Sequence, residues 1–115
     1  MSGLRRGGFE VAWQNEGRNG RHEVYGWTLG LFGLHRSRRL EWTVTHLGTG
    51  YGTAWFRTRA EAADFVLAVA DWDDWQRPDL LEVFERDDGY RAVFRDRLLD
   101  AMTQARRGRR ARPPA

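Results

Sequence analysis

The sequence contains no cysteine among its 115 residues, which excludes disulfide bridges, thiolate metal sites and thiol nucleophiles. It also contains no lysine and no isoleucine, so every one of its 19 basic residues is an arginine. Because arginine, glycine, alanine and tryptophan have GC-rich codons, a GC-rich coding sequence accounts for much of this bias. The positions of the arginines are therefore more informative than their number.

Long hydrophobic runs are missing as well. The longest, residues 65–70, is far shorter than the roughly 18 residues of a membrane span. Arg5 and Arg6 resemble the start of a twin-arginine export signal, but Glu10 and Gln14 interrupt the segment that follows. We therefore expect a cytoplasmic protein with no membrane partner. With 41% hydrophobic and 30% charged residues, the chain has the composition of one folded domain.

Charges of opposite sign are unevenly distributed along the chain. Residues 1–59 hold nine arginines and four acidic residues, residues 60–105 hold five and twelve, and residues 106–115 hold five arginines and no acid. This layout predicts a basic β-rich surface, an acidic helical surface and a basic tail. An acidic helix face and a tail that only keep the protein soluble would produce the same layout.

Four segments have the patterns of extended structure. Residues 9–14 alternate apolar and polar side chains, and residues 22–32 are rich in aromatic and β-branched residues. Residues 35–39 are predicted as a basic loop. Residues 40–47 and 53–56, joined by the glycine-rich turn 48–52, predict a hairpin. Within it, alternation places Leu40, Trp42, Val44 and His46 on one face and Glu41, Thr43 and Thr45 on the other.

The second half of the chain has helical patterns. Thr58 and Glu61 have the spacing of a capping box, which predicts a helix over about 59–72. Asp79 predicts the start of a short second helix, and residues 90–105 repeat apolar side chains at helical spacing. Residues 81–86 and 90–95 could instead pair as a hairpin around an Asp-Gly turn, but the length of the periodic run favours the helix.

These elements together predict an α+β fold. A three-stranded, mainly antiparallel sheet would pack against a helix, followed by one or two further helices. Residues 1–105 would form the single domain, and residues 106–115 a basic disordered tail.

No group of residues has the spacing of a catalytic site. The three histidines are not placed as metal ligands on a helix, and the glycines lack the strand–turn–helix context of a nucleotide-binding loop. Asp71, Asp73 and Asp74 are an incomplete ligand set for magnesium. We therefore expect no enzymatic activity, no metal and no cofactor.

The predicted hairpin is the best candidate for a binding surface. Its outward face would carry Thr43, Thr45, Trp55 and Arg57. The alternative for Trp55 is that its side chain covers a second small core formed by the last helices. Arginine binds phosphates or guanine, threonine contacts phosphates, and tryptophan stacks on unpaired bases. Further arginines lie in the preceding loop, at the helix start and in the tail: Arg36, Arg38, Arg39, Arg59, Arg106, Arg107, Arg109 and Arg110.

One stretch of the chain is similar to a known family. Trp42-x-Val44, the turn at Gly50 and Phe56-Arg57-Thr58-Arg59-Ala60-Glu61-Ala62-x-x-Phe65 resemble the arm-type DNA-binding domain at the N-terminus of phage integrases and related tyrosine recombinases. The resemblance covers about a quarter of the chain. It implies a three-stranded sheet that lies in the DNA major groove, followed by one helix. Its contact candidates here are Thr43, Thr45, Trp55 and Arg57.

We therefore predict a small non-enzymatic, nucleic-acid-associated protein from a phage or another mobile element. It would bind DNA through the basic sheet face and the arginine-rich tail. The alternative is a protein-interaction module, either an adaptor or a phage-type inhibitor, that uses the acidic helical half. Its contact residues would be Asp71, Trp72, Asp73, Asp74 and Trp75.

Overall fold

The computed structural model describes residues 3–15, 18–37 and 41–111, with the side chains of these ranges except 13–15, 18–19 and 109–111. Five antiparallel strands form one sheet in the order β1-β2-β3-β4-β5. They are β1 (Arg5–Asn15), β2 (Arg18–Leu29), β3 (Phe32–Arg36), β4 (Trp42–His46) and β5 (Gly52–Phe56). The helices are α1 (Arg59–Val69), the 3₁₀ turn η1 (Asp73–Gln76), α2 (Leu80–Arg86) and α3 (Asp88–Ala111). The predicted α+β class with an antiparallel sheet is confirmed.

The number of strands differs from the prediction of three. Segment 22–32, predicted as continuous, contains a reversal of the chain: β2 ends at Leu29, and β3 begins at Phe32. Gly30 makes this turn possible with a left-handed φ of 60°. β3 continues through Arg36, so the predicted loop 35–39 begins inside a strand. The turn contains only two residues and no Asn or Asp, which is why the local sequence does not mark it.

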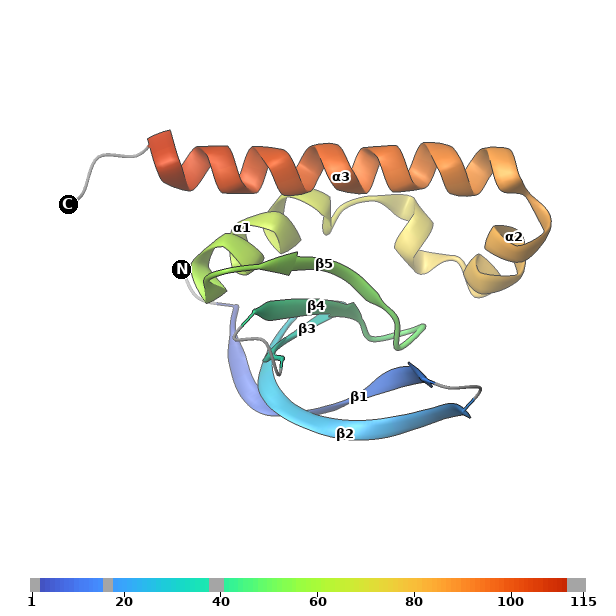
Figure 1. The fold of residues 1–115 in the computed structure, drawn as a ribbon, viewed down its shortest axis with the longest axis horizontal. Coiled ribbons are helices and arrows are strands. Elements are labelled where there is room, and N and C mark those ends of the chain that lie inside the picture. The colour runs from blue at the N-terminus through green and yellow to red at the C-terminus, as the bar shows by residue number, and fades with distance from the viewer. Residues whose placement is uncertain (1–2, 16–17, 38–40, 112–115) are drawn as a thin grey trace.

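Helices cover one face of the sheet, as Figure 1 shows. α1 lies against β3, β4 and β5, and α3 runs across α1 and β5. Burying each large apolar side chain between these layers contributes about 1.5–3 kcal/mol. The main core includes Phe32, Leu34, Val44 and Phe56 from the sheet and Phe65, Val66, Val69 and Phe94 from the helices.

The first two strands curl over the other face of the sheet (Figure 1). Phe9 of β1 packs its ring over Gly33 of β3, where a Cβ atom would lie only 2.6 Å from the ring. The N–H of Ala12 donates to the carbonyl oxygen of Gly50, in the β4–β5 turn, at 2.6 Å. Gly50 has a φ of 80°, as expected for the glycine-rich turn. The curl therefore brings the first strand of the sheet onto the last hairpin.

This curl buries the face of β4 that was predicted to point outward. Thr45 pairs with Gly33, which lies under the Phe9 ring, and Thr43 pairs with His35, whose ring centroid is 5.9 Å from that of Phe9. Only 8% of Thr43 and 1% of Thr45 are exposed. The prediction that the two threonines lie on an outward face is therefore wrong.

The predicted cap of the first helix is confirmed. The Oγ1 atom of Thr58 accepts a hydrogen bond from the N–H of Glu61 at 3.1 Å, so one free N–H group at the start of α1 is satisfied. α1 ends at Val69, three residues before the predicted end. Within the described ranges, no helix combines the length and the apolar character needed to cross a membrane.

Residues 81–95 form helices and not the alternative hairpin. Asp87 separates α2 from α3, because its backbone is extended and its carboxylate accepts from the N–H of Tyr90 at 3.0 Å. Asp87 therefore caps the third helix. α3 continues past residue 105, the predicted end of the domain, to Ala111. Residues 112–115 of the predicted tail lie outside the described residues.

The close approach of β2 to β3 at Gly26 predicts the effect of a substitution there. A Cβ atom at Gly26 would lie 2.1 Å from the carbonyl oxygen of Leu34, whereas one at Gly7, its cross-strand partner, would meet nothing within 4 Å. Because backbone atoms cannot move aside, we expect Gly26→Ala to lower the free energy of unfolding by about 3 kcal/mol. Gly7→Ala should change it by less than about 1 kcal/mol. Urea denaturation checks both values, and equal midpoints for the two variants would contradict the packing.

Candidate nucleic-acid interface

Arginines from five different segments gather at one end of the molecule, where β3 and β5 end and α1 begins. Two of them, Arg6 of β1 and Arg59 of α1, lie over the ring of Trp27. Arg36 is the cross-strand partner of Trp42. Arg57 follows β5, and Arg106 of α3 donates to the backbone of Trp55. We call these five residues the basic end: Arg6, Arg36, Arg57, Arg59 and Arg106.

A cleft of about 560 Å³ opens at the basic end, on the convex side of β2. Sheet geometry explains which side chains meet there, because residues two apart in a strand share a face and directly paired residues share a face. Tyr25 and Trp27 therefore stand side by side, as do Arg36 and Trp42. We call this the basic-aromatic cleft, and its lining contains no acidic side chain: Arg6, Gly7, Tyr25, Gly26, Trp27, Arg36 and Trp42.

Aromatic contacts hold two arginines beside the cleft. The guanidinium carbon of Arg59 lies 4.4 Å from the ring centroid of Trp27, and that of Arg6 lies 5.9 Å from it. Such cation–π contacts contribute about 0.5–1 kcal/mol at exposed sites. A carboxylate partner would neutralise the guanidinium charge, whereas an aromatic ring is uncharged and leaves the positive charge of Arg6 and Arg59 in place. None of the described carboxylates forms an ion pair with Arg6, Arg36 or Arg59. The cleft therefore presents positioned cations to an anionic ligand.

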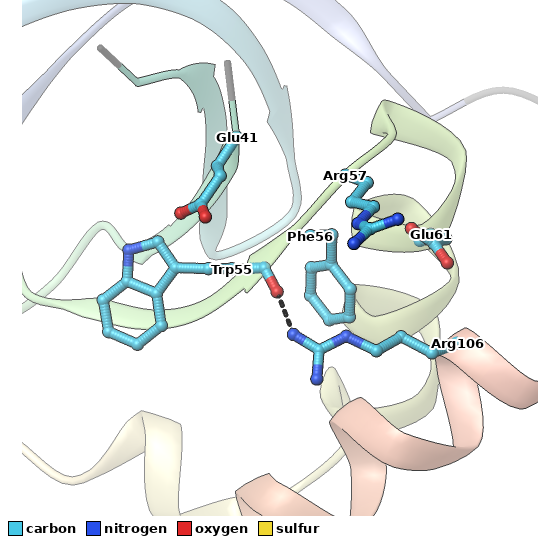
Figure 2. Close-up of a pocket in the computed structure, with 6 residues that line it drawn as sticks. All are labelled: Glu41, Trp55, Phe56, Arg57, Glu61 and Arg106. Carbon is cyan, nitrogen blue, oxygen red and sulfur yellow. Dashed lines mark hydrogen bonds between the residues drawn. The ribbon is translucent and has the colours of Figure 1, made fainter. Parts of the chain in front are cut away.

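A second, smaller hollow of about 300 Å³ lies beside the cleft, and Figure 2 shows its lining. Arg106 donates to the carbonyl oxygen of Trp55 at 2.6 Å and lies 5.2 Å from the ring centroid of Phe56. The Trp55 side chain is 46% exposed and points away from Arg106 (Figure 2). Two carboxylates, those of Glu41 and Glu61, also line this hollow. Its charge is therefore mixed, and the basic-aromatic cleft is the more favourable site for an anion.

The predicted nucleic-acid residues thus fall into separate groups. Arg36, Arg57, Arg59 and Arg106 come together at the basic end, with Trp55 beside them. Arg107 is exposed on α3. Arg38 and Arg39 lie outside the described residues, and so do the side chains of Arg109 and Arg110, whose backbone belongs to α3.

The aromatic half of the cleft was not predicted from the sequence. Tyr25 and Trp27 alternate in β2, a signal that was available but was used only to predict extended structure. Their proximity to Arg36 and Trp42 depends on the unrecognised turn between β2 and β3. Arg6 was missed because residues 1–8 have the composition of a frayed terminus.

The acidic segment 71–75 has a structural role that contradicts part of its predicted function. Trp75 is only 5% exposed, and its indole N–H donates to the carbonyl oxygen of Val69 at 2.8 Å. Trp72 packs parallel to Trp75, and Arg97 of α3 covers it at 4.0 Å. The prediction that Trp75 is an exposed contact for a partner is wrong, because this side chain completes the core.

Asp74 ties the same segment to α3, whereas Asp71 and Asp73 are exposed. The carboxylate of Asp74 accepts hydrogen bonds from the hydroxyl of Tyr90 and, at 3.1 Å, from the guanidinium of Arg97. Burial alone would raise the pKa of Asp74, but these hydrogen bonds outweigh it, so its pKa lies below the usual value.

The helical layer as a whole carries both signs of charge. Four of its arginines pair with neighbouring carboxylates, so positive and negative groups are intermixed on the surface that residues 60–105 were predicted to make acidic. The pairs are Arg77–Asp79, Arg86–Asp79, Arg91–Asp88 and Arg97–Asp74.

An apolar groove of about 800 Å³ lies between α2, α3 and the β4–β5 hairpin. Trp55, Leu81 and Leu99 are its exposed large side chains. It lies on the opposite side of Trp55 from the basic end, and no sequence pattern predicted it.

His46 has a structural environment in the core. His46 is buried against Trp75, and its Nδ1 atom lies 3.1 Å from the hydroxyl of Thr49. Burial lowers the pKa of His46 despite an opposing hydrogen bond with the backbone of Trp75. In the part of the chain that the structure describes, no three histidine or carboxylate side chains converge to hold a metal ion.

Comparisons with protein families, with curated proteins and with solved structures find no match for this chain.

The role of Asp74 predicts how stability depends on pH. We expect Asp74→Asn to lower the free energy of unfolding by about 1–2 kcal/mol near neutral pH, because the hydrogen bonds lose their charge. Since the folded-state pKa of Asp74 is depressed, its contribution is present above the unfolded-state pKa and is lost as the pH falls through the folded-state pKa. The difference between variant and wild type should therefore shrink on acidification.

Asp73→Asn is the matched control, since Asp73 is an exposed neighbour with no ion pair among the described residues. Thermal unfolding over a pH series measures both variants. A constant difference between Asp74→Asn and wild type at every pH would show that the carboxylate charge is not the cause.

Proposed function

We propose that this protein is a small, non-enzymatic nucleic-acid-binding protein that binds through the basic-aromatic cleft. One observation carries the proposal: Arg6, Arg36 and Arg59 lie around a cleft that has aromatic walls and no acidic lining. A polyanion with aromatic bases is the ligand whose chemistry matches this combination. Arg57 and Arg106 add two positive charges beyond the cleft, in the hollow that Glu41 and Glu61 also line.

The physical basis of the affinity is phosphate neutralisation. Arginines that bind phosphates release the counterions condensed on the nucleic acid, so affinity falls as salt rises. Stacking of Arg59 and Arg6 on Trp27 fixes their position before binding, which reduces the entropy lost on complex formation. DNA as the ligand and a phage or another mobile element as the source rest on the resemblance of residues 42–65 to integrase arm domains, although Thr43 and Thr45, two of its contact candidates, are buried in this fold.

A protein partner for the acidic segment has weaker support. Trp75 is in the core, and Asp74 is occupied by Tyr90 and Arg97. Among the predicted contact residues, Asp71 and Asp73 are the exposed ones, and Trp72 is half-buried under Arg97. Two exposed carboxylates offer less for specific binding than the cleft does.

The proposal predicts the effect of removing one cleft arginine. We expect Arg36→Gln to weaken binding to a short DNA duplex or single strand and to reduce the slope of log affinity against log salt by about 0.7–0.9. The reason is the loss of one phosphate contact. Fluorescence anisotropy between about 50 mM and about 200 mM salt measures the slope.

Arg86→Gln is the charge-matched control. Arg86 lies on α2, at the opposite end of the molecule from the start of α1 (Figure 1), and pairs with Asp79 at 3.8 Å. It should leave the slope unchanged. Absence of binding to any nucleic acid at low salt, or equal losses in the two variants, would refute the cleft as the site.

A further inference from the structure

We propose that the basic-aromatic cleft binds single-stranded nucleic acid, with an unpaired base stacked on Tyr25 and phosphates held by Arg6, Arg36 and Arg59. This inference rests on the proposed function and adds the form of the nucleic acid. Three features of the structure support it: one exposed ring, the cleft beside that ring and the charges that border the cleft.

Tyr25 is the most exposed large aromatic side chain in the described part of the chain. It is 78% exposed although it lies in the middle of β2, between Val24 and Gly26. Its ring stands at the edge of the cleft, on the same face as Trp27. The ring of Trp27 is covered by Arg59 and packs on the main core, so it holds the arginine in place and offers no free face to a base. The free ring surface available for a base is therefore that of Tyr25.

The routes by which this fold could read a duplex are obstructed. Thr43 and Thr45 of the β4–β5 hairpin are buried beneath β1, so that hairpin presents no polar face to a DNA groove. The β1–β2 hairpin is the longest two-stranded ribbon, but Glu10 and Glu23 are directly paired on it. By alternation these carboxylates share the face of Tyr25. Arg21 pairs with Glu10 at 3.9 Å, so Glu23 is the carboxylate of this pair that has no ion-pair partner among the described residues and would repel a phosphate row of a duplex.

The same acidic pair defines the direction of the bound strand. Glu10 and Glu23 border Tyr25 on one side, and the cleft with its arginines borders Tyr25 on the other. A single strand can place one base on Tyr25 and pass its phosphates toward Arg59 without meeting the carboxylates. The cleft volume of about 560 Å³ lies in the range of about 300–1,000 Å³ that is typical of small-ligand pockets, which suits individual nucleotides.

The test compares two forms of DNA with the full-length protein. The probes are a labelled oligothymidylate of about 12 nucleotides and a duplex of the same length, titrated at low salt by fluorescence anisotropy. We expect the single strand to bind at least about tenfold more tightly than the duplex. Tyr25→Ala should weaken single-strand binding about 5- to 150-fold, the range expected for the loss of one stacked base.

Two further variants separate stacking from general effects. Tyr25→Phe keeps the ring and should bind the single strand within about threefold of wild type. Trp55→Ala removes an exposed aromatic side chain outside the cleft and should have no effect on single-strand binding. Because Tyr25 is exposed, its substitution leaves the core intact, and circular dichroism confirms folding of each variant.

The outcomes distinguish this inference from the proposed function. Salt-dependent binding of the duplex that equals or exceeds binding of the single strand, with loss in Arg36→Gln, would overturn the inference and keep the function. A loss in Trp55→Ala in place of Tyr25→Ala would also overturn it, since the base would then stack in the other hollow. Failure of both probes to bind at low salt would remove the function itself.

Discussion

The packing of β1 across the second face of the sheet is the constraint on which the other features depend. Phe9 occupies the space above Gly33, and the Ala12 N–H bonds to the carbonyl oxygen of Gly50, so the first strand is held against the last hairpin. The curl requires β2 to approach β3 so closely that only glycine fits at position 26. The same path places Arg6 over Trp27 and leaves the ring of Tyr25 on the convex side.

Arginines are held differently in the two halves of the fold. In the helical layer they pair with carboxylates, as Arg97 does with Asp74, and their charge is partly neutralised. At the basic end they stack on aromatic rings, as Arg59 does on Trp27, and keep their charge. The cleft arginines Arg6, Arg36 and Arg59 thus have no carboxylate partner among the described residues, whereas four arginines of the helical layer do.

Much of the fold was predictable where local interactions decide it. Thr58 caps α1 and Asp87 separates two helices through hydrogen bonds within three residues, and both follow from sequence spacing. The turn at Gly50 was predictable for the same reason. The turn at Gly30 was not, because it is short and has only one typical turn residue. That omission hid a strand and, with it, the meeting of Trp27 with Arg36 in one cleft.

The sequence by itself determined the α+β class, the start of α1, the last hairpin and four of the five arginines of the basic end. Tertiary structure alone decided that Thr43, Thr45 and Trp75 are buried and that Tyr25 is exposed. The physical reason is that strand alternation specifies which side chains share a face, whereas contacts between distant segments decide which face is covered. For Thr43 and Thr45 those contacts are made by Phe9 of β1, more than thirty residues earlier in the chain, and no local pattern in β4 records its presence.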